Sequence, residues 1–138
     1  MADLFRFGVS LPKDLLDKFD KLISQKGYSN RSEAFRDIIR QELVKEEWAG
    51  VSDVVGAITL VYDHHKRELV NKLTDIQHDF QDIIISTQHI HLDHDNCLEI
   101  IAAKGGPDKV KKLADSLRSV KGVKHGAISM SSTGKGIR

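Results

Sequence analysis

The sequence predicts an α+β protein in two parts, an N-terminal strand–helix–helix unit followed by a βαββαβ domain. Three observations support this fold class. Residues 4–11 alternate apolar and polar side chains, which is typical of a half-buried strand. Two stretches with apolar residues at helical spacing follow, up to about Trp48. Beyond a short linker, apolar runs of strand length alternate with two further helical stretches.

The composition indicates a folded chain with room for one ordinary domain or two small ones. The 138 residues are 40% hydrophobic and 30% charged, close to the averages of globular proteins. No apolar run approaches the roughly 18 residues of a membrane span, and the N-terminus lacks the features of a signal peptide, so we expect a cytoplasmic protein without a membrane partner. With 21 basic and 20 acidic side chains the net charge is +1, so any contact with nucleic acid depends on local placement of charge.

The first strand and helix follow from the pattern before Lys26. One face of the strand carries the apolar side chains of Phe5, Phe7, Val9 and Leu11, and the other carries Arg6, Gly8 and Ser10. Pro12 is expected at the first helical position, where its missing N–H costs no hydrogen bond. The helix then has an apolar stripe, formed by Leu15, Leu16, Phe19, Leu22 and Ile23.

A second helix is predicted from Asn30 to about Trp48. Asn30 is a good N-cap, and Glu33 stands three residues later, as in a capping box. The apolar stripe of this helix comprises Ala34, Phe35, Ile38, Ile39 and Leu43. We therefore assign residues 1–48 to one domain and residues 49–53, with a glycine and a serine, to a linker.

This first domain is physically incomplete as a single copy. A lone strand leaves its backbone hydrogen-bonding groups unpaired, and about 45 residues barely bury a core. We expect two copies to pair their strands into an antiparallel ribbon over four helices. The apolar strand face would then point inward, and Arg6, Gly8 and Ser10 would point outward twice over.

The outward face of such a ribbon has the chemistry of a DNA-reading surface. A two-stranded ribbon fits the major groove, where Arg6 can bind guanine and Ser10 can form hydrogen bonds, whereas Gly8 has no side chain to offer. The start of the second helix, with Asn30, Arg31 and Ser32, offers free backbone N–H groups to a phosphate. Arg36 lies one turn further on and could make a second phosphate contact.

Residues 54–130 are predicted to form a ferredoxin-like domain, a four-stranded antiparallel sheet with both helices on one face. The expected strands are 54–62, 83–93, 97–104 and 123–129, and the expected helices are 66–80 and 107–120. An Asp95-Asn96 turn joins the second and third strands. The tail over 131–138, rich in serine, glycine and charge, is expected to be flexible.

Two histidines and the one cysteine of the chain converge in this domain. His89 and His91 are two residues apart on one strand, so both imidazoles project from the same face. Cys97 follows the turn and can approach His91 across the hairpin. His78, near the end of the preceding helix, is a fourth candidate that could meet the others across a subunit interface. Since a single cysteine excludes an internal disulfide, and imidazole and thiolate suit nickel, copper and zinc, the pattern favours a metal site.

The remaining polar candidates are assigned other roles. Glu99 lies on the same strand face as the cysteine, and we expect it to accept a hydrogen bond from a ligand histidine. His64, His65 and His94 are expected to be solvated, and His125 has no evident partner. The sequence contains no G-x-S-x-G, P-loop or H-E-x-x-H motif, so we predict that the protein is not an enzyme.

Three stretches together resemble the nickel-responsive ribbon-helix-helix regulators, the NikR family. They are residues 6–11, the run 27–37 and the segment 86–99 with its His-x-His-x5-Cys pattern. The first two alone indicate only a ribbon-helix-helix protein, a large class that includes plasmid antitoxins. The third, within a βαββαβ domain, is far more specific, and the resemblance covers nearly the whole chain.

The resemblance implies a homotetramer, in which two ribbon-helix-helix dimers flank four central ACT-like domains. It implies one Ni(II) per chain in a square-planar site, with ligands that match His89, His91 and Cys97 of one chain and His78 of its neighbour. It also implies that nickel raises the affinity for palindromic operator DNA and represses nickel-uptake genes. Positions that match Arg6, Gly8 and Ser10 read the DNA in this family, and a further cation site uses positions that match Glu33 and Asp37. Glycine at position 8 departs from the hydrogen-bonding residue of some members, which leaves the operator sequence open.

Two alternatives stay open from the sequence. A metal-independent ribbon-helix-helix regulator would bind a small metabolite in its ACT-like half, although the loop Asp63-His64-His65 lacks the glycine that such a pocket favours. A metallohydrolase would use Glu99 as a general base beside a metal with an open position. The metal itself also stays open among nickel, copper, zinc and cobalt, because planar coordination would depend on subunit packing.

Overall fold

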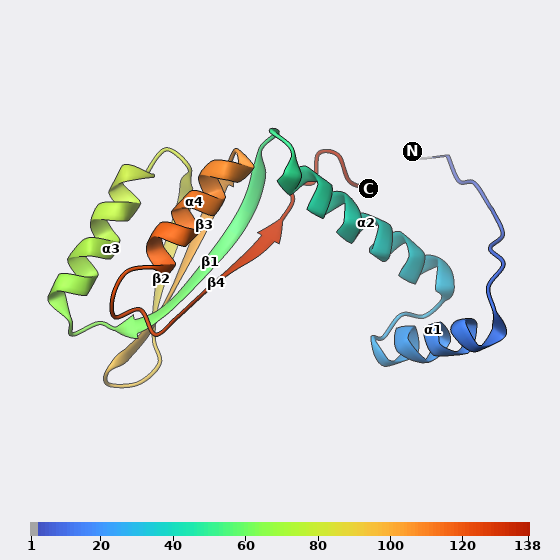
Figure 1. The fold of residues 1–138 in the computed structure, drawn as a ribbon, viewed down its shortest axis with the longest axis horizontal. Helices are drawn as coiled ribbons and strands as arrows, with labels where there is room; N and C mark the ends of the chain where they lie inside the picture. The colour runs from blue at the N-terminus through green and yellow to red at the C-terminus, as the bar shows by residue number, and fades with distance from the viewer. Residues whose placement is uncertain (1–2) are drawn as a thin grey trace. The chain divides into compact units, whose positions relative to one another are not determined.

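The computed structural model describes residues 3–138, which divide into two compact units, one up to Ile39 and one over Arg40–Arg138. Figure 1 shows the elements in chain order, which are α1 (Lys13–Gln25), α2 (Arg31–Ala49), β1 (Val54–Asp63), α3 (Arg67–Asp79), β2 (Ile84–His91), β3 (Asn96–Gly105), α4 (Pro107–Arg118) and β4 (His125–Ser131). No helix in the described part of the chain is long and apolar enough to cross a membrane.

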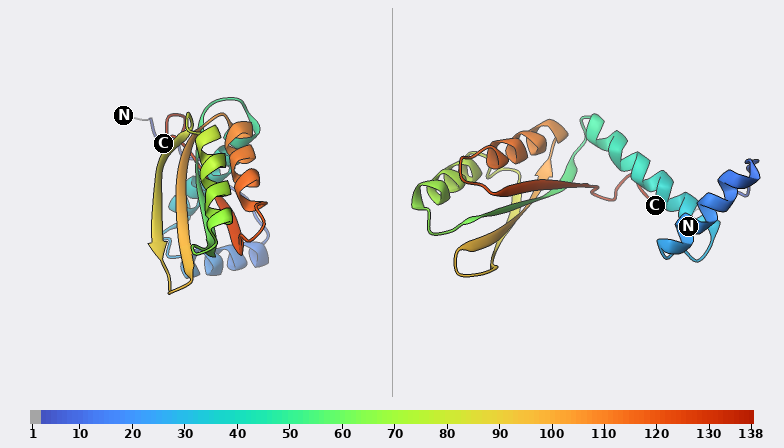
Figure 2. Two further views of the ribbon diagram at one scale, coloured as in Figure 1. Left: turned by 90° about the vertical axis from the view of Figure 1, so that its left-hand side faces the viewer. Right: turned by 60° about the horizontal axis from the view of Figure 1, so that its bottom comes forward.

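The second unit contains the predicted βαββαβ domain. Its four strands form one antiparallel sheet in the order β2-β3-β1-β4. The left view of Figure 2 shows α3 and α4 side by side on one face of this sheet. The fold class is therefore confirmed, and most element ends lie within two residues of their predicted places. The last strand starts later than expected because Val123 closes a turn onto the carbonyl of Val120, with Gly122 at a φ of 102°.

The core of the domain lies between the sheet and its two helices. Alternate residues of β1 and β3 are buried, as expected for strands with one face covered. The largest fully buried apolar side chains of this layer are those of Val54, Ile58, Leu60, Leu73, Ile101, Val110, Leu113 and Leu117. This packing fixes the register of β3 against β1, and with it the direction in which the side chains of both strands point.

Truncation of Leu117 to alanine is expected to destabilise this domain strongly. The side chain of Leu117 is fully buried in the core, so Leu117→Ala would leave a cavity that costs about 2–5 kcal/mol in free energy of unfolding. Urea titrations of the native protein and the variant, both at the same protein concentration, measure the difference in free energy of unfolding. Lys112→Ala, at an exposed position of the same helix, is the control and should change the free energy by less than about 0.5 kcal/mol.

Helix α2 begins as its sequence predicts and ends in the second unit. The Asn30 side-chain oxygen accepts a hydrogen bond of 2.9 Å from the Glu33 backbone N–H, so Asn30 is the N-cap. At the other end, Trp48 is buried, and its indole Nε1 donates to the Ser131 carbonyl at 2.8 Å. A Cβ atom at Gly56 would lie only 3.1 Å from the Trp48 ring, so β1 leaves room for the indole by carrying glycine there. The tail beyond β4 also contacts this helix, through a 3.3 Å hydrogen bond from Ser132 Oγ to Glu47 Oε1.

The N-terminal segment differs from its prediction. Residues 4–11, expected to form a strand, adopt neither strand nor helix in the single chain. The physical reason is that no neighbouring strand in one chain can receive their backbone hydrogen bonds. Pro12 also lies outside the helix, at the N-cap with a ψ of 141°, and Lys13 is the first helical residue. The segment leaves large apolar side chains in solvent, with Phe5 88% and Phe7 76% exposed.

Candidate functional site

The hairpin of β2 and β3 brings the predicted ligands His91 and Cys97 together. In the register of this pair the two residues are direct partners, so they lie opposite each other on the same face. The loop between them is held by the Asp93 side-chain oxygen, which accepts hydrogen bonds from the backbone N–H groups of Asp95 and Asn96 at 2.9 and 2.8 Å. This is the Asx turn that an aspartate at such a position favours, and it places Cys97 at the start of β3.

Burial differs sharply between the donors on the two strands. Cys97 is 3% exposed, because β3 is an inner strand whose helix-facing side is covered. The side chain of His89 is 53% exposed, because β2 is an edge strand of the sheet. The Cys97 sulfur is therefore shielded from solvent, whereas the imidazoles of His89 and His91 are accessible to solvent or to another chain.

A buried carboxylate contacts one of the predicted ligands, His89. Glu99 is 1% exposed and pairs with His89 across the hairpin, with 3.4 Å between His89 Nε2 and Glu99 Oε2. Tyr62 Oη donates to Glu99 Oε1 at 2.6 Å, and Gln77 Nε2 donates to Oε2 at 2.7 Å. When the Nε2–H group of a neutral His89 faces the Glu99 carboxylate, the lone pair on Nδ1 is left for another partner.

Tyr62 and Gln77 were not among the residues predicted from the sequence. Tyr62 is the register partner of Cys97 on β1, and Gln77 directly precedes His78 on α3. Burial, followed by the hydrogen bond to Glu99, raises the pKa of Tyr62 above its usual value, so the phenol keeps its proton and remains a donor. The sequence signal for Tyr62 is its place on the buried face of a strand, where a polar group needs a partner.

His78 stands apart from the other three predicted ligands in the single chain. It lies in the last turn of α3 and is exposed. Among the described residues, a group of three potential ligand atoms within 4.8 Å of one another occurs only at His65, His94 and Asp95. The set of His78, His89, His91 and Cys97 is thus not assembled by one chain, and its completion by a neighbouring chain stays a prediction.

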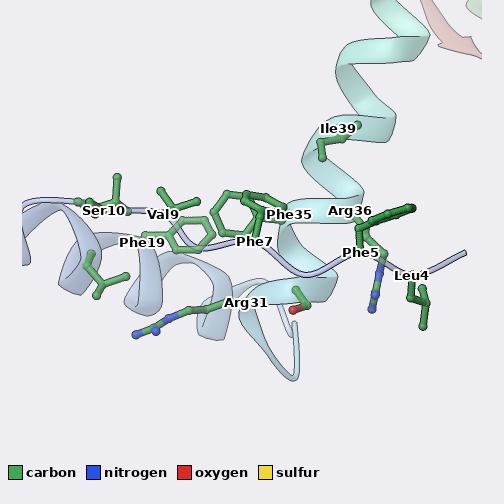
Figure 3. A pocket seen from close by; sticks show the side chains of 13 residues that line it. Leu4, Phe5, Phe7, Val9, Ser10, Phe19, Arg31, Phe35, Arg36 and Ile39 are labelled. Atoms are coloured by element: carbon green, nitrogen blue, oxygen red, sulfur yellow. The ribbon is translucent and has the colours of Figure 1, made fainter.

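The predicted DNA contacts all lie at or near the N-terminal unit. Arg6, Gly8 and Ser10 are exposed along the extended segment. Figure 3 shows the apolar side chains of that segment lining a hollow together with Phe19, Phe35 and Ile39. At the start of α2, Ser32 and Arg36 are exposed, as a phosphate contact would require.

Arg31 already has a partner within its unit. Its guanidinium donates from Nε and Nη2 to the two oxygens of Asp20, at 2.9 and 2.8 Å. The hydrogen bond from Arg31 holds the pKa of Asp20 below its usual value. Arg31 must therefore give up or share this carboxylate in order to contact a phosphate.

The Asp20–Arg31 pair leads to a prediction about pH. An Asp whose pKa is lowered by folding contributes stability above the unfolded value of 3.8, and this contribution is lost as the pH falls through the lowered pKa. NMR titration of the Asp20 carboxyl should give a pKa below 3.8 in the native protein and a higher one in Arg31→Gln. Equal values in the two proteins would show that the pair does not form in solution.

The two acidic residues of the predicted further cation site also have partners. Glu33 Oε2 accepts a hydrogen bond of 2.8 Å from Ser29 Oγ, and the Tyr28 hydroxyl donates to Asp37. The hydrogen bond to Asp37 raises the pKa of Tyr28 above its usual value. Both carboxylates are thus committed to contacts at the start of α2, and a cation there stays a prediction.

Each half of the chain matches a known protein family. The model of the NikR C-terminal nickel-binding domain matches residues 55–131, and the model of ribbon-helix-helix proteins of the copG family matches residues 6–46. A relative from Syntrophus aciditrophicus, named "Putative nickel-responsive regulator", is 59% identical over 135 residues, 98% of each chain. A relative of the same name from Chlorobium limicola is 58% identical over 134 residues, 97% of this chain and 100% of its own.

A solved structure resembles about half of this chain in its fold. The uncharacterized protein TM1266 from Thermotoga maritima covers 57% of this chain and 98% of its own, with a TM-score of 0.52 and 14% identity. This likeness concerns the fold alone. The family itself follows from the domain models and from relatives of more than half identity over the full length. The chain belongs to the NikR family of nickel-responsive ribbon-helix-helix transcription regulators, which are not enzymes.

Proposed function

We propose that this protein is a nickel-dependent repressor, which binds palindromic operator DNA when loaded with one Ni(II) per chain and thereby controls nickel uptake. It would act in the cytoplasm as a homotetramer, a dimer of dimers. The observation that carries the proposal is the pairing of His91 with Cys97 beside the contact of His89 with the buried Glu99 carboxylate.

The chemistry of these donors fits nickel. Imidazole nitrogen and thiolate sulfur are ligands that late first-row metals prefer over magnesium or calcium. Cys97 offers its sulfur from a sheltered position, while His89 is oriented by a carboxylate, as ligand histidines usually are. His89, His91 and Cys97 would hold the ion from one chain.

The fourth ligand is proposed to come from a neighbouring chain. His78 is exposed at the end of α3, and β2, which carries His89 and His91, is an edge strand. Both are therefore accessible to another copy. A bound nickel ion supplies a link between ligands of two chains, so metal binding and assembly of the sheet domains would support each other.

DNA binding would require the N-terminal segments of two copies. Residues 4–11 have unpaired backbone groups and exposed aromatic side chains, which pairing with a second segment would satisfy. The resulting ribbon would bury Phe5 and Phe7 and present Arg6 and Ser10 to the major groove. The hollow lined by Phe19, Phe35 and Ile39 would receive the apolar side of the ribbon.

Repression in response to nickel requires that nickel binding and DNA binding be energetically coupled. If nickel raises the affinity of the protein for DNA by some factor, DNA must raise the affinity for nickel by the same factor. The coupling would act through the preferred arrangement of the two DNA-binding dimers, which must fit both halves of a palindrome at once.

The test combines selection of DNA with a metal titration. Double-stranded oligonucleotides are selected from a random pool by the full-length protein with stoichiometric nickel, and the affinity for the selected duplex is then measured with and without nickel. We expect a selected palindrome and an affinity at least about tenfold higher with nickel, which corresponds to a coupling of about 1.4 kcal/mol. Equal affinities in the two conditions would contradict the proposal and favour a metal-independent regulator.

A further inference from the structure

The chain beyond β4 runs back along the last turns of α2 and contacts them at two places (Figure 1). Ser132 Oγ donates to Glu47 Oε1 at 3.3 Å, and Arg40 Nε donates to the Arg138 carbonyl oxygen at 2.6 Å. The two helix residues are separated by about 10 Å along the helix axis, which is roughly two turns. We call residues 132–138 the strap.

The strap also has hydrogen bonds within itself. The Gly134 backbone N–H donates to Ser132 Oγ at 3.0 Å, and the Ile137 N–H donates to the Gly134 carbonyl at 3.4 Å. Gly134 has a φ of 84°, which suits glycine and strains residues with a side chain. Residues 132–138, whose composition predicts flexibility, therefore follow a defined path along α2.

The end of α2 is bound to the sheet domain by further contacts. The buried Trp48 donates from Nε1 to the Ser131 carbonyl at 2.8 Å, and Lys111 Nζ of α4 donates to the Trp48 carbonyl at 3.1 Å. A lysine at this place serves a carbonyl that has no partner within the helix. The strap adds a contact about two turns earlier, at Arg40. The last turns of α2 are thus held near both of their ends.

One feature of the strap opposes its closure. A Cβ atom at Gly136 would lie 3.6 Å from Glu47 Oε1, so the backbone of the strap passes close over the Glu47 carboxylate. The other oxygen, Glu47 Oε2, is buried and has no hydrogen-bond partner among residues 3–138. A buried carboxylate oxygen without a partner costs free energy, which the few hydrogen bonds of the strap must offset. We therefore expect the closed strap to be only marginally stable and able to open.

We propose that the strap is a conformational device that couples α2 to the sheet domain. α2 is one continuous helix, which begins in the first unit and ends in the second. When the strap is closed, the turns from Arg40 to Trp48 move with the sheet domain, so a change in that domain is passed on to α2. When the strap is open, only the end of the helix is held, and the turns before it can open locally. Opening therefore weakens the transmission.

The first test measures the strap in full-length, metal-free protein without DNA. Arg40→Ala removes a hydrogen bond from the side of α2, and Gly134→Val strains the strap itself, because a β-branched residue disfavours a φ of 84°. Lys45→Ala and Lys135→Ala, at exposed positions of the helix and of the strap, are the matched controls. We expect amide hydrogen exchange of residues 40–49 to become about threefold faster or more in the two variants and to stay unchanged in the controls. Exchange at the native rate in both variants would overturn the strap.

The second test measures the coupling, which rests on the proposed nickel response. The gain in affinity for the selected duplex on addition of nickel should fall by about threefold or more in Arg40→Ala and Gly134→Val and persist in the two controls. Circular dichroism and a nickel titration without DNA show whether each variant keeps its fold and its metal site. Faster exchange with an undiminished nickel effect would overturn the coupling role. A native protein without a nickel effect would overturn the proposed function and the coupling role, whereas the exchange rates would still confirm or overturn the strap itself.

Discussion

Nickel binding is expected to weaken by about 100-fold or more when Cys97 is replaced by alanine. Loss of a residue that merely orients a metal ligand typically costs 10–100-fold in metal affinity, so loss of a ligand itself should cost at least as much. Cys97 is the one thiol of the chain, and no other sulfur ligand of comparable strength can replace it. The measurement is a nickel titration of the metal-free protein followed by ultraviolet-visible absorption. A thiolate-to-nickel charge-transfer band should saturate at one nickel per chain in the native protein and be absent from the variant.

Two further proteins make this result specific. His89→Ala should also weaken nickel binding, because it removes both an imidazole and the contact with Glu99. His125→Ala is the control, since this exposed histidine lies on β4, on the far side of β1 from the hairpin. A nickel affinity that Cys97→Ala leaves unchanged would refute the proposed ligand set, whatever the variant does to DNA binding.

Replacement of Phe7 by aspartate is expected to lower the affinity for operator DNA to the non-specific level, about 1000-fold or more below the specific one. Phe7 lies on the apolar side of the extended segment and is 76% exposed in the single chain. In a paired ribbon the aspartate would be buried without a partner, which strongly disfavours pairing. Fluorescence anisotropy with the duplex selected by the native protein measures the loss.

Arg6→Ala is the matched control for the Phe7 variant, because the two neighbouring residues lie on opposite faces of the same segment. We expect Arg6→Ala to keep the native oligomeric state in sedimentation analysis and to lose DNA affinity through a missing base contact worth about 1–3 kcal/mol. Phe7→Asp should instead change the assembly of the N-terminal domains. If Phe7→Asp binds DNA as well as the native protein, the segment does not pair as proposed.

The sheet domain was largely predictable because its signals are local. Apolar runs of strand length mark β1 and β3, helical spacing marks α3 and α4, and an aspartate-rich turn separates β2 from β3. The start of α2 was equally predictable, because the Asn30 side chain accepts a hydrogen bond from a backbone N–H group only three residues later. The segment 4–11 was predicted as a strand from the alternation of its apolar and polar side chains, yet a strand is a pairing between chains or segments, and one chain offers no partner here.

The candidate site was likewise predictable only in part. The approach of Cys97 to His91 follows from hairpin register alone and was foreseen. The contacts of Tyr62 and Gln77 with Glu99 join three elements that are far apart in sequence, and only the packed fold reveals them. The cluster of His65, His94 and Asp95 was missed for the same reason, since it depends on two loops that meet only after the sheet has formed.

The burial of Trp48 gives this protein an internal optical probe. The chain contains a single tryptophan, so its intrinsic indole fluorescence comes from one place. Trp48 lies where the end of α2 contacts β1 and β4. There its side chain is 3% exposed and donates a hydrogen bond to the Ser131 carbonyl. Emission should therefore be shifted to short wavelength while this contact holds and should move to longer wavelength when it opens. Without any attached dye, the wavelength would reveal whether the end of α2 stays docked on the sheet domain as metal or DNA is added.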